Sequence, residues 1–191
     1  METKEQRINA IRLQCHEKKF HAFGYSYLYT CRAKIYEKRL QIINYAGLVV
    51  PLFIGGYVMT YGTETTKLLL IIGGGILLLQ LIFSALALIY KWDEELAYSI
   101  ESAREHSSLY QDFNELGSRP PSNYDEILSR FSILIERDRS RSMQDLKHDV
   151  GEKMKIKGMR WSLREFQRKC VGCDTIPYDM NKTNCPVCGK Y

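Results

Sequence analysis

The chain has 191 residues, a net charge of +5 and a charged fraction of 26%, which on average describe a basic soluble protein. The average is misleading, because almost all of the charge lies outside residues 42–90. This distribution excludes a uniformly soluble domain and indicates a membrane segment between two polar regions. No signal peptide is expected, because the first apolar stretch begins at residue 42 and lacks a small-residue cleavage pattern.

The N-terminal region, residues 1–41, is basic and is predicted to be helical. Ile8, Ile11 and Cys15 recur at helical spacing, and Gly24 is expected to interrupt the helix. A second helix from Ser26 is expected to run into the membrane. Its basic residues suit contact with anionic lipid headgroups or with an anionic ligand. They equally suit an ordinary flank that sets topology, which is the interpretation we favour.

Two uncharged apolar stretches follow, residues 42–61 and 68–90, joined by the short segment 62–67. A bilayer core about 30 Å thick needs ~20 helical residues at a rise of about 1.5 Å each, so each stretch can span it. A connection this short predicts two antiparallel transmembrane helices. The alternative is a buried helix pair in a soluble protein, and the rest of the chain is too polar to cover such a pair.

The distribution of Lys and Arg predicts the orientation. Nine of them precede Asn44, whereas the 62–67 segment carries only Lys67, balanced by Glu64. Positive charge is retained on the cytoplasmic side, so both termini are expected in the cytoplasm and the 62–67 turn outside it.

One face of the second apolar stretch carries small and polar residues. They are Gly73, Leu77, Gln80, Ser84 and Ala87. Such residues in a bilayer face other helices or a pore. Packing within one hairpin accounts for this stripe. Assembly of several chains around a pore lined by Gln80 and Ser84 accounts for it as well, and we expect a homo-oligomer such as a tetramer.

Residues 91–158 are predicted to form cytoplasmic helices. Because no Gly or Pro occurs from Ile76 to Leu116, one helix is expected to extend from the membrane through residue 116. The sequence at 117–122 ends it, and Ser122 is expected to cap the next helix. The charged stretch 137–142 is expected to be a turn before a last helix that ends near Gly158.

The C-terminal region, residues 159–191, carries two CxxC pairs separated by 11 residues. They are Cys170, Cys173, Cys185 and Cys188. Two such pairs can supply four thiolates to one tetrahedral Zn²⁺, and a cytoplasmic location disfavours disulfides. Four protein ligands leave no open position for catalysis. A small zinc-knuckle or zinc-ribbon module is predicted.

A basic and aromatic segment lies just before these cysteines. It comprises Arg160, Trp161, Arg164, Arg168 and Lys169. Basic side chains beside an aromatic ring can hold phosphates and stack a base, so a nucleotide or a nucleic acid is a candidate ligand. A solvated basic helix accounts for the same composition.

The predicted fold class is therefore an all-α membrane protein, in which a two-helix transmembrane hairpin carries cytoplasmic helical extensions and the zinc module. An enzyme is not expected. The four histidines, His16, His21, His106 and His148, are scattered, and no nucleophile–base pair or phosphate loop accompanies them.

The CxxC-x11-CxxC spacing on a short chain with this hairpin resembles the bacterial mobilome proteins described by that signature. The hairpin and its flank KWDEELAYSIESAREHSSLY resemble the SLATT group of two-helix membrane effectors over roughly the first 120 residues, by hydropathy and helix order. The resemblance implies a pore-forming effector of anti-phage defence in the bacterial inner membrane. It also implies a partner nucleotidyltransferase that makes a nucleotide signal, as in Hailong-type systems.

Two functions are compatible with these features. In the first, an oligomeric channel responds to a cytoplasmic nucleotide or oligonucleotide and depolarises the membrane. In the second, the protein is a membrane-anchored adaptor whose zinc module recruits a protein or nucleic acid without forming a pore.

Overall fold

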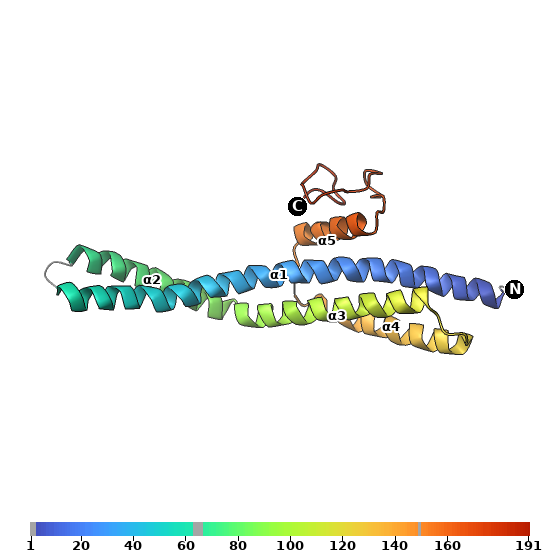
Figure 1. Ribbon diagram of the computed structural model, residues 1–191, viewed down its shortest axis with the longest axis horizontal. Helices are drawn as coiled ribbons and strands as arrows, with labels where there is room; N and C mark the ends of the chain where they lie inside the picture. The colour runs from blue at the N-terminus through green and yellow to red at the C-terminus, as the bar shows by residue number, and fades with distance from the viewer. Residues whose placement is uncertain (1–2, 63–66, 149) are drawn as a thin grey trace. The chain divides into compact units, whose positions relative to one another are not determined.

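A computed structural model describes residues 3–62, 67–148 and 150–191 of the chain. The described residues form five helices, joined by turns, and contain no strand (Figure 1). The helices are α1 (Lys4–Tyr61), α2 (Lys67–Ile89), α3 (Trp92–Ser118), α4 (Tyr124–Asp145) and α5 (Glu152–Glu165). The prediction of an all-helical chain is confirmed.

The chain divides into two compact units. Unit 1 comprises Met1–Cys31 and Ser99–Tyr191, and unit 2 comprises Arg32–Tyr98. Unit 1 therefore contains the beginning of α1, most of α3, α4, α5 and the cysteine-containing tail (residues 166–191). Unit 2 contains the rest of α1, all of α2 and the first turns of α3.

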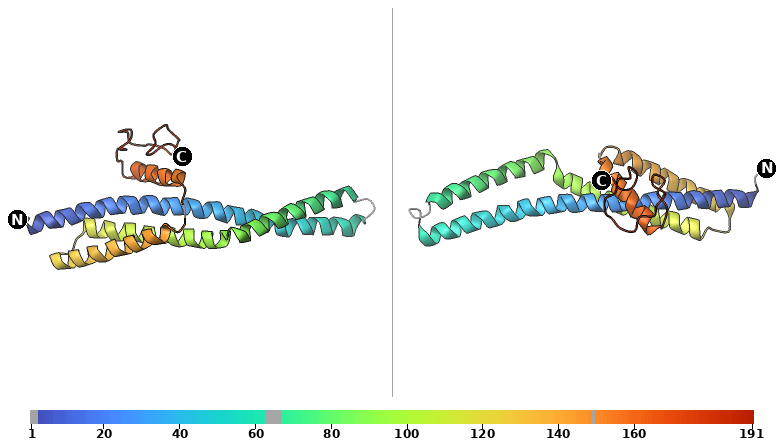
Figure 2. Two further views of the ribbon diagram at one scale, coloured as in Figure 1. Left: turned by 180° about the vertical axis from the view of Figure 1, so that it is seen from behind. Right: turned by 90° about the horizontal axis from the view of Figure 1, so that it is seen from above.

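Unit 1 contains a three-helix bundle in which α1, α3 and α4 lie side by side in both views of Figure 2. Each helix carries residues spaced alternately by three and four positions, the heptad pattern of packed helices. In α1 these are Ile8, Ile11, Cys15, Lys18, Ala22, Tyr25 and Tyr29. In α3 they are Ser99, Ser102, His106, Leu109, Phe113 and Leu116. In α4 they are Tyr124, Ile127, Phe131, Leu134, Asp138, Arg141 and Asp145.

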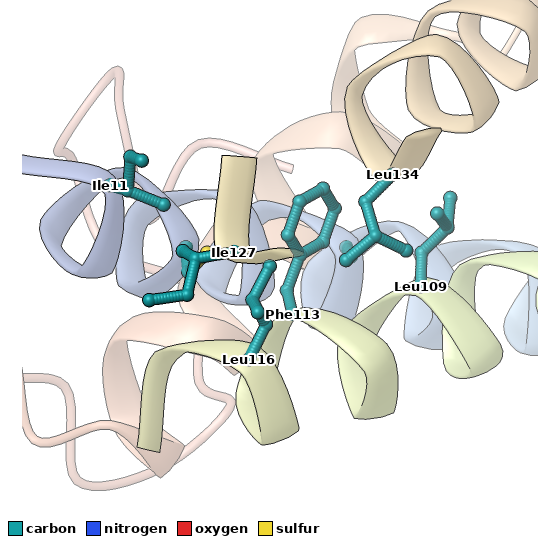
Figure 3. Packing of buried hydrophobic residues seen from close by; sticks show 8 residues of the cluster. Ile11, Leu109, Phe113, Leu116, Ile127 and Leu134 are labelled. Carbon is teal, nitrogen blue, oxygen red and sulfur yellow. The ribbon is translucent and has the colours of Figure 1, made fainter. Parts of the chain in front are cut away.

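One end of this bundle has an apolar core. Phe113 is fully buried and packs with Ile127, Leu134 and Leu116, while Ile11 contributes from α1 (Figure 3). Cys15 of α1 belongs to the same cluster. Burying a side chain of this size contributes about 1.5–3 kcal/mol. Burial also raises the pKa of Cys15 to about 11, so this thiol acts as a small apolar core residue.

The other end of the bundle has a polar core that the sequence analysis did not predict. Asp145 Oδ1 accepts hydrogen bonds from Ser102 Oγ at 2.8 Å and from Arg141 Nε at 3.2 Å. Asp145 Oδ2 lies 2.7 Å from His106 Nε2. The rings of Tyr25 and Tyr29 stack with that of His106 at centroid distances of 5.1 and 5.8 Å. The sequence signal that could have predicted this polar core is that its residues in α3 and α4 occupy the same heptad positions as the apolar core residues.

The expected helix interruption at Gly24 and helix end near Gly158 are wrong. Both glycines lie inside helices, where α1 and α5 approach closely. A Cβ atom on Gly158 would lie 2.8 Å from the carbonyl oxygen of Gly24, closer than real Cβ contacts. Ser162 Oγ donates a buried hydrogen bond of 3.0 Å to the carbonyl oxygen of Phe20 beside this contact. The glycines therefore permit helix packing rather than ending a helix.

Replacing Gly158 by Val should separate α5 from α1. The added side chain meets backbone rather than a movable side chain, and overpacking of this kind costs about 1–3 kcal/mol. We expect a lower melting temperature and a changed emission of Trp161, whose ring stacks on Tyr27 at 4.3 Å. The measurement is thermal unfolding followed by tryptophan fluorescence in a Trp92→Phe background. Gly151→Val is the control, because a Cβ there meets nothing within 4 Å, and equal melting temperatures for the two variants would contradict the prediction.

The expected continuous helix from the second apolar stretch through residue 116 is also wrong. The chain breaks between α2 and α3 at Lys91, whose φ of 51° lies in the left-handed region. The first turn of α3 then carries Asp93, Glu94 and Glu95. Acidic side chains stabilise a helix N-terminus, so this acidic cluster was the available signal for a new helix.

Two smaller expectations about the cytoplasmic helices are corrected. The charged stretch 137–142 is not a turn but part of α4, where Arg137 and Arg141 form ion pairs with residues of α3. The cap of α4 is Asn123 rather than Ser122, because the Asn123 side chain accepts a hydrogen bond from the Asp125 N–H at 3.1 Å.

Unit 2 is a pair of helices in which α2 packs on the second part of α1. A Cβ atom on Gly47 would lie 2.7 Å from Gln80 Nε2, and one on Gly73 would lie 2.6 Å from Ile54 Cδ1. Arg32 and Glu95 form an ion pair of 2.7 Å, and Arg39 lies over the ring of Trp92. Residues 63–66 of the predicted turn lie outside the described residues. Lys67, which was assigned to this turn, is the first residue of α2.

Both helices of unit 2 contain stretches that are long and apolar enough to cross a membrane, by length and composition. None of the apolar window in α1 and only 11% of that in α2 is buried inside the chain. A core helix of a soluble protein would be mostly buried. These exposed apolar surfaces support membrane association.

Candidate metal centre

The tail after α5 forms two tight backbone turns, each of which begins with one CxxC pair. In the first turn, the Asp174 N–H donates to the carbonyl oxygen of Cys170 and the Gly172 N–H points to Cys170 Sγ at 3.4 Å. In the second, the N–H groups of Gly189 and Lys190 donate to the carbonyl oxygen of Cys185. These turns bring both sulfur atoms of each pair to one side of the backbone, as metal-binding knuckles require.

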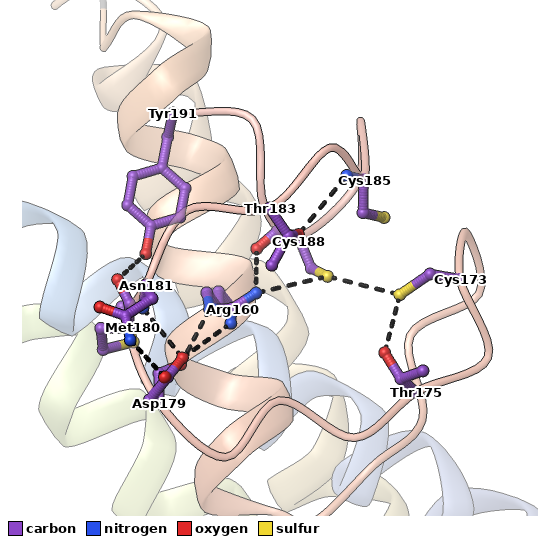
Figure 4. A network of polar contacts seen from close by, with 10 residues as sticks. All are labelled: Arg160, Cys173, Thr175, Asp179, Met180, Asn181, Thr183, Cys185, Cys188 and Tyr191. Carbon is purple, nitrogen blue, oxygen red and sulfur yellow. Dashed lines mark hydrogen bonds and ion pairs between the residues drawn. The ribbon is translucent and has the colours of Figure 1, made fainter.

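The four sulfur atoms converge on one point. All of them lie within 4.8 Å of one another. Cys170 Sγ and Cys185 Sγ are 3.8 Å apart. Cys173 Sγ and Cys188 Sγ are also 3.8 Å apart (Figure 4), so each short distance joins the two turns. A tetrahedral metal with metal–sulfur bonds of about 2.3 Å separates its sulfur ligands by ~3.8 Å. The cluster could therefore bind a metal ion.

The four cysteines differ in their surroundings. Cys170 and Cys188 are buried in a cluster with Phe20 of α1 and Leu163 of α5, whereas Cys173 is exposed. Burial raises the pKa of the Cys170 and Cys188 thiols. The hydrogen bond with the Thr175 hydroxyl lowers the pKa of Cys173 to about 6. A metal ion would replace the protons that the buried thiols otherwise retain.

Arg160, predicted to be a nucleotide ligand, lies within the metal centre and is only 4% exposed. Its Nε donates to the carbonyl oxygen of Asp179 at 2.8 Å and its Nη2 to Asp179 Oδ1 at 3.1 Å. Its Nη1 donates to the carbonyl oxygen of Cys188 at 3.1 Å (Figure 4). Arg160 thus ties the segment between the two turns to the second turn. Its positive charge lies beside the cysteine cluster, where it would offset the negative charge of thiolates that bind a metal ion.

Replacing Arg160 by Leu should weaken metal retention, because the second turn loses its link to Asp179 and a buried cation. Loss of a group that supports metal ligands typically costs 10–100-fold in affinity. We expect at least tenfold faster release of the metal to a chelating dye from the Leu variant. Arg164→Leu is the control, because Arg164 lies over the ring of Trp161 rather than beside a cysteine. Unchanged release from the Arg160 variant would contradict this role.

The other residues of the predicted basic segment do not form one surface with Arg160. The ring of Trp161 is stacked on Tyr27 and lies below the guanidinium of Arg164 at 4.4 Å. Arg168 forms a two-bond ion pair with Glu17, and this pairing lowers the pKa of Glu17. Lys169 pairs with Asp174 on the first turn. These contacts hold α5 and the tail against α1.

The predicted small and polar stripe of the second apolar stretch lies between the two helices of unit 2. Gly73 and Ala87 are buried, and Leu77, Gln80 and Ser84 are half-buried, whereas most of their neighbours in α2 are exposed. Gln80 lies against Gly47. Pro51 in α1 has no N–H, so the carbonyl group of Gly47, four residues earlier, lacks its usual hydrogen bond within the helix. The side-chain amide of Gln80 lies at this position. The stripe therefore serves the packing of one hairpin.

Comparison with known proteins identifies one family. The family model described as mobilome CxxCx(11)CxxC protein matches residues 12–191, and its signature coincides with the four clustered cysteines. A search of the curated proteins and a search of the solved structures gave no match. The chain belongs to the mobilome CxxCx(11)CxxC protein family.

Proposed function

We propose that this protein is an oligomeric effector of a bacterial anti-phage defence system that forms a pore in the inner membrane. The observation that carries the proposal is the exposure of two apolar helical stretches in unit 2, of which at most 11% is buried in the chain. Such surfaces need lipid, other copies of the chain, or both. The family description, which refers to the mobilome, and the resemblance to SLATT effectors support the proposed biological setting.

The outward faces of unit 2 suit association of several hairpins. Gly55 and Gly56 of α1 and Gly74 and Gly75 of α2 have nothing within 4 Å of a Cβ position. In membranes, small residues on a helix surface let a neighbouring helix approach closely. We therefore propose that these glycines contact other copies, and that a pore forms among hairpins, because Gln80 and Ser84 already pack within one hairpin.

The cytoplasmic part of the proposal concerns unit 1. We propose that both termini lie in the cytoplasm, on the basis of the Lys and Arg distribution, and that the metal is Zn²⁺. Four cysteine sulfur atoms within 4.8 Å of one another, of which two pairs are 3.8 Å apart, suit this ion, and a closed set of four ligands suits a structural role. Unit 1 would then receive the signal, a nucleotide or oligonucleotide made by a partner nucleotidyltransferase, and control the pore.

Membrane potential in bacteria that express the chain tests the proposal. Depolarisation is expected during phage infection or in the presence of the partner enzyme, followed with a potential-sensitive dye. Replacing Gly74 and Gly75 by Leu should abolish it, because the bulky side chains keep neighbouring hairpins apart. The control replaces the exposed Leu78 and Leu79 of the same helix by Ile, which conserves their size. An unchanged potential in every state would contradict the pore.

The second candidate function is a membrane-anchored adaptor that recruits a partner through the metal module. The packing of the polar stripe inside the hairpin favours it, because a single hairpin then offers lipid an almost wholly apolar surface. An adaptor leaves the membrane potential unchanged in every state. It loses its partner when Cys188 is replaced, which a co-purification experiment measures.

A further inference from the structure

The polar half of the bundle core in unit 1 is costly for a merely structural element. Apolar heptad residues such as Leu109 and Phe113 give way in the same helix to Ser99, Ser102 and His106, all buried. Buried polar groups stabilise a bundle less than well-packed apolar residues of similar volume. Cores that depart from apolar packing are found mainly at functional sites, so this polar half of the core is a candidate functional site.

A cavity of about 320 Å³ lies at this polar end, within the size range of small-molecule sites. Residues of α1, α3, α4, the turn after α4, and α5 line it, among them Tyr25, His106, Arg139, His148 and Lys155. His106 is 2% exposed, and its Nδ1 has no hydrogen-bond partner among the residues that the structure describes. An unpaired buried ring nitrogen in a cavity wall is available to a ligand, as donor or acceptor.

Among the described residues that line this cavity, Arg139 and Lys155 are cationic and Asp145 is acidic. Asp145 is already engaged by Ser102, His106 and Arg141. By contrast, Arg139 and Lys155 have no acidic partner in the described parts of the chain. Two unpaired cations at the wall of one cavity attract an anion, and a guanidinium can bind a phosphate or carboxylate through two parallel hydrogen bonds.

The aromatic part of the wall adds a second requirement. Tyr25 stacks with His106 and is 40% exposed, so part of its ring remains available. Burial and the nearby Asp145 and Asp138 carboxylates raise the pKa of Tyr25, which keeps its hydroxyl protonated and able to donate. The planar ring of a ligand can stack on the exposed part of the Tyr25 ring, as nucleobases stack on aromatic side chains in proteins that bind single-stranded nucleic acids.

We propose that this cavity binds a small phosphate-bearing ligand with a planar ring, the chemistry of a nucleotide, with Arg139 and Lys155 on the phosphate, Tyr25 on the ring, and His106 Nδ1 on a ring or sugar polar group. The proposal deepens the proposed function, on which it rests for the effect of the ligand on the membrane. It assigns the ligand to the cavity of unit 1 that is lined by α1, α3, α4 and the beginning of α5, and not to the basic segment at 160–169.

Isothermal titration calorimetry on the full-length, metal-loaded protein in detergent tests the site. The probes are adenosine monophosphate, uridine monophosphate, ribose 5-phosphate and adenosine. We expect at least one nucleoside monophosphate to bind, with ribose 5-phosphate and adenosine at least tenfold weaker. Arg139→Gln combined with Lys155→Gln should weaken binding of that nucleotide at least tenfold. Both side chains are exposed, so the double variant should fold, and Lys153→Gln on the same helix α5 is the control.

The outcomes separate this site from the proposed pore. Absence of binding by both nucleotides at millimolar concentration would overturn the site. So would equally tight binding of ribose 5-phosphate, or a double variant that binds like the unmodified protein. Depolarisation of cells by a protein that binds neither nucleotide would overturn the site alone. Nucleotide binding by a protein that never depolarises a membrane would overturn the pore and support the site.

Discussion

Replacing Cys188 by Ser is expected to empty the metal centre and release the tail from α1. Cys188 supplies one of four sulfur atoms that lie within 4.8 Å of one another, and it is 1% exposed in a cluster with Phe20 and Leu163. A neutral hydroxyl replaces a thiolate, so affinity should fall by more than the roughly 10–100-fold that loss of a supporting group costs. Metal content by mass spectrometry should drop from about one ion per chain to a small fraction of that.

The structural consequence of this substitution is also large. The tail contains no helix and has few buried apolar residues of its own. Metal binding would therefore supply most of its folding free energy, and in zinc peptides the binding free energy is about 10–16 kcal/mol. Limited proteolysis should therefore cleave the variant after Lys169 and Lys182, as it should the unmodified protein after chelation. The three-helix bundle should remain resistant, since its core contains none of the four ligands.

Two controls make this prediction specific. Cys31→Ser removes a cysteine outside the cluster and should change neither metal content nor proteolysis. Cys173→Ser should have the mildest effect of the four ligand substitutions on the tail, because Cys173 is exposed and packs against no apolar neighbour in the buried cluster. Full metal content in the Cys188 variant would show that the four cysteines do not form one site.

The sequence predicted the cluster of four cysteines, because the pairing within each CxxC motif is local. The two CxxC pairs determine which four side chains come together, and the two tight turns bring both sulfur atoms of each pair to one side of the backbone. The role of Arg160 could not be predicted in the same way. Its partners Asp179 and Cys188 lie 19 and 28 residues away, and composition alone does not distinguish a buried supporting cation from a solvated one.

The glycines show a different limit. Gly24 and Gly158 looked like helix interruptions when each was considered in its own segment. In the structure Gly24 of α1 lies against Gly158 of α5, although the two glycines are 134 residues apart in the sequence. Each glycine leaves room for the backbone of the other helix. A glycine inside a helical pattern is ambiguous between a break and a close approach, and only the identity of the neighbouring helix resolves the ambiguity.

The hairpin and the bundle were predictable to different degrees. Uncharged stretches of 20 and 23 residues identify candidate membrane spans without any tertiary information. Only half of the bundle core is predictable, because apolar periodicity in the sequence marks Phe113 and Ile127 but not Ser102 and His106. These polar residues occupy the same heptad positions further along the helix. A pattern defined by hydrophobicity misses core positions that are polar.

Asp145→Ala is expected to be the most destabilising substitution in unit 1 outside the metal centre. It removes the acceptor shared by Ser102, His106 and Arg141, and leaves Arg141, which is 5% exposed at its side chain, without its buried carboxylate. Removing one partner of a buried ion pair costs about 3–5 kcal/mol. At roughly 2–4 °C per kcal/mol, the melting temperature of unit 1 should fall by roughly 10 °C. Fluorescence of Trp161 in a Trp92→Phe background reports on unit 1 alone.

The control for Asp145 is the other carboxylate that Arg141 contacts. Glu101 lies 3.0 Å from Arg141 Nη1, but its side chain is 65% exposed, and exposed ion pairs contribute only about 0–1 kcal/mol. Glu101→Ala should therefore lower the melting temperature by no more than about 4 °C. If both variants melted together, the buried network would contribute no more than a surface pair. A large difference would instead show that loss of Asp145 leaves Arg141 as an uncompensated buried charge.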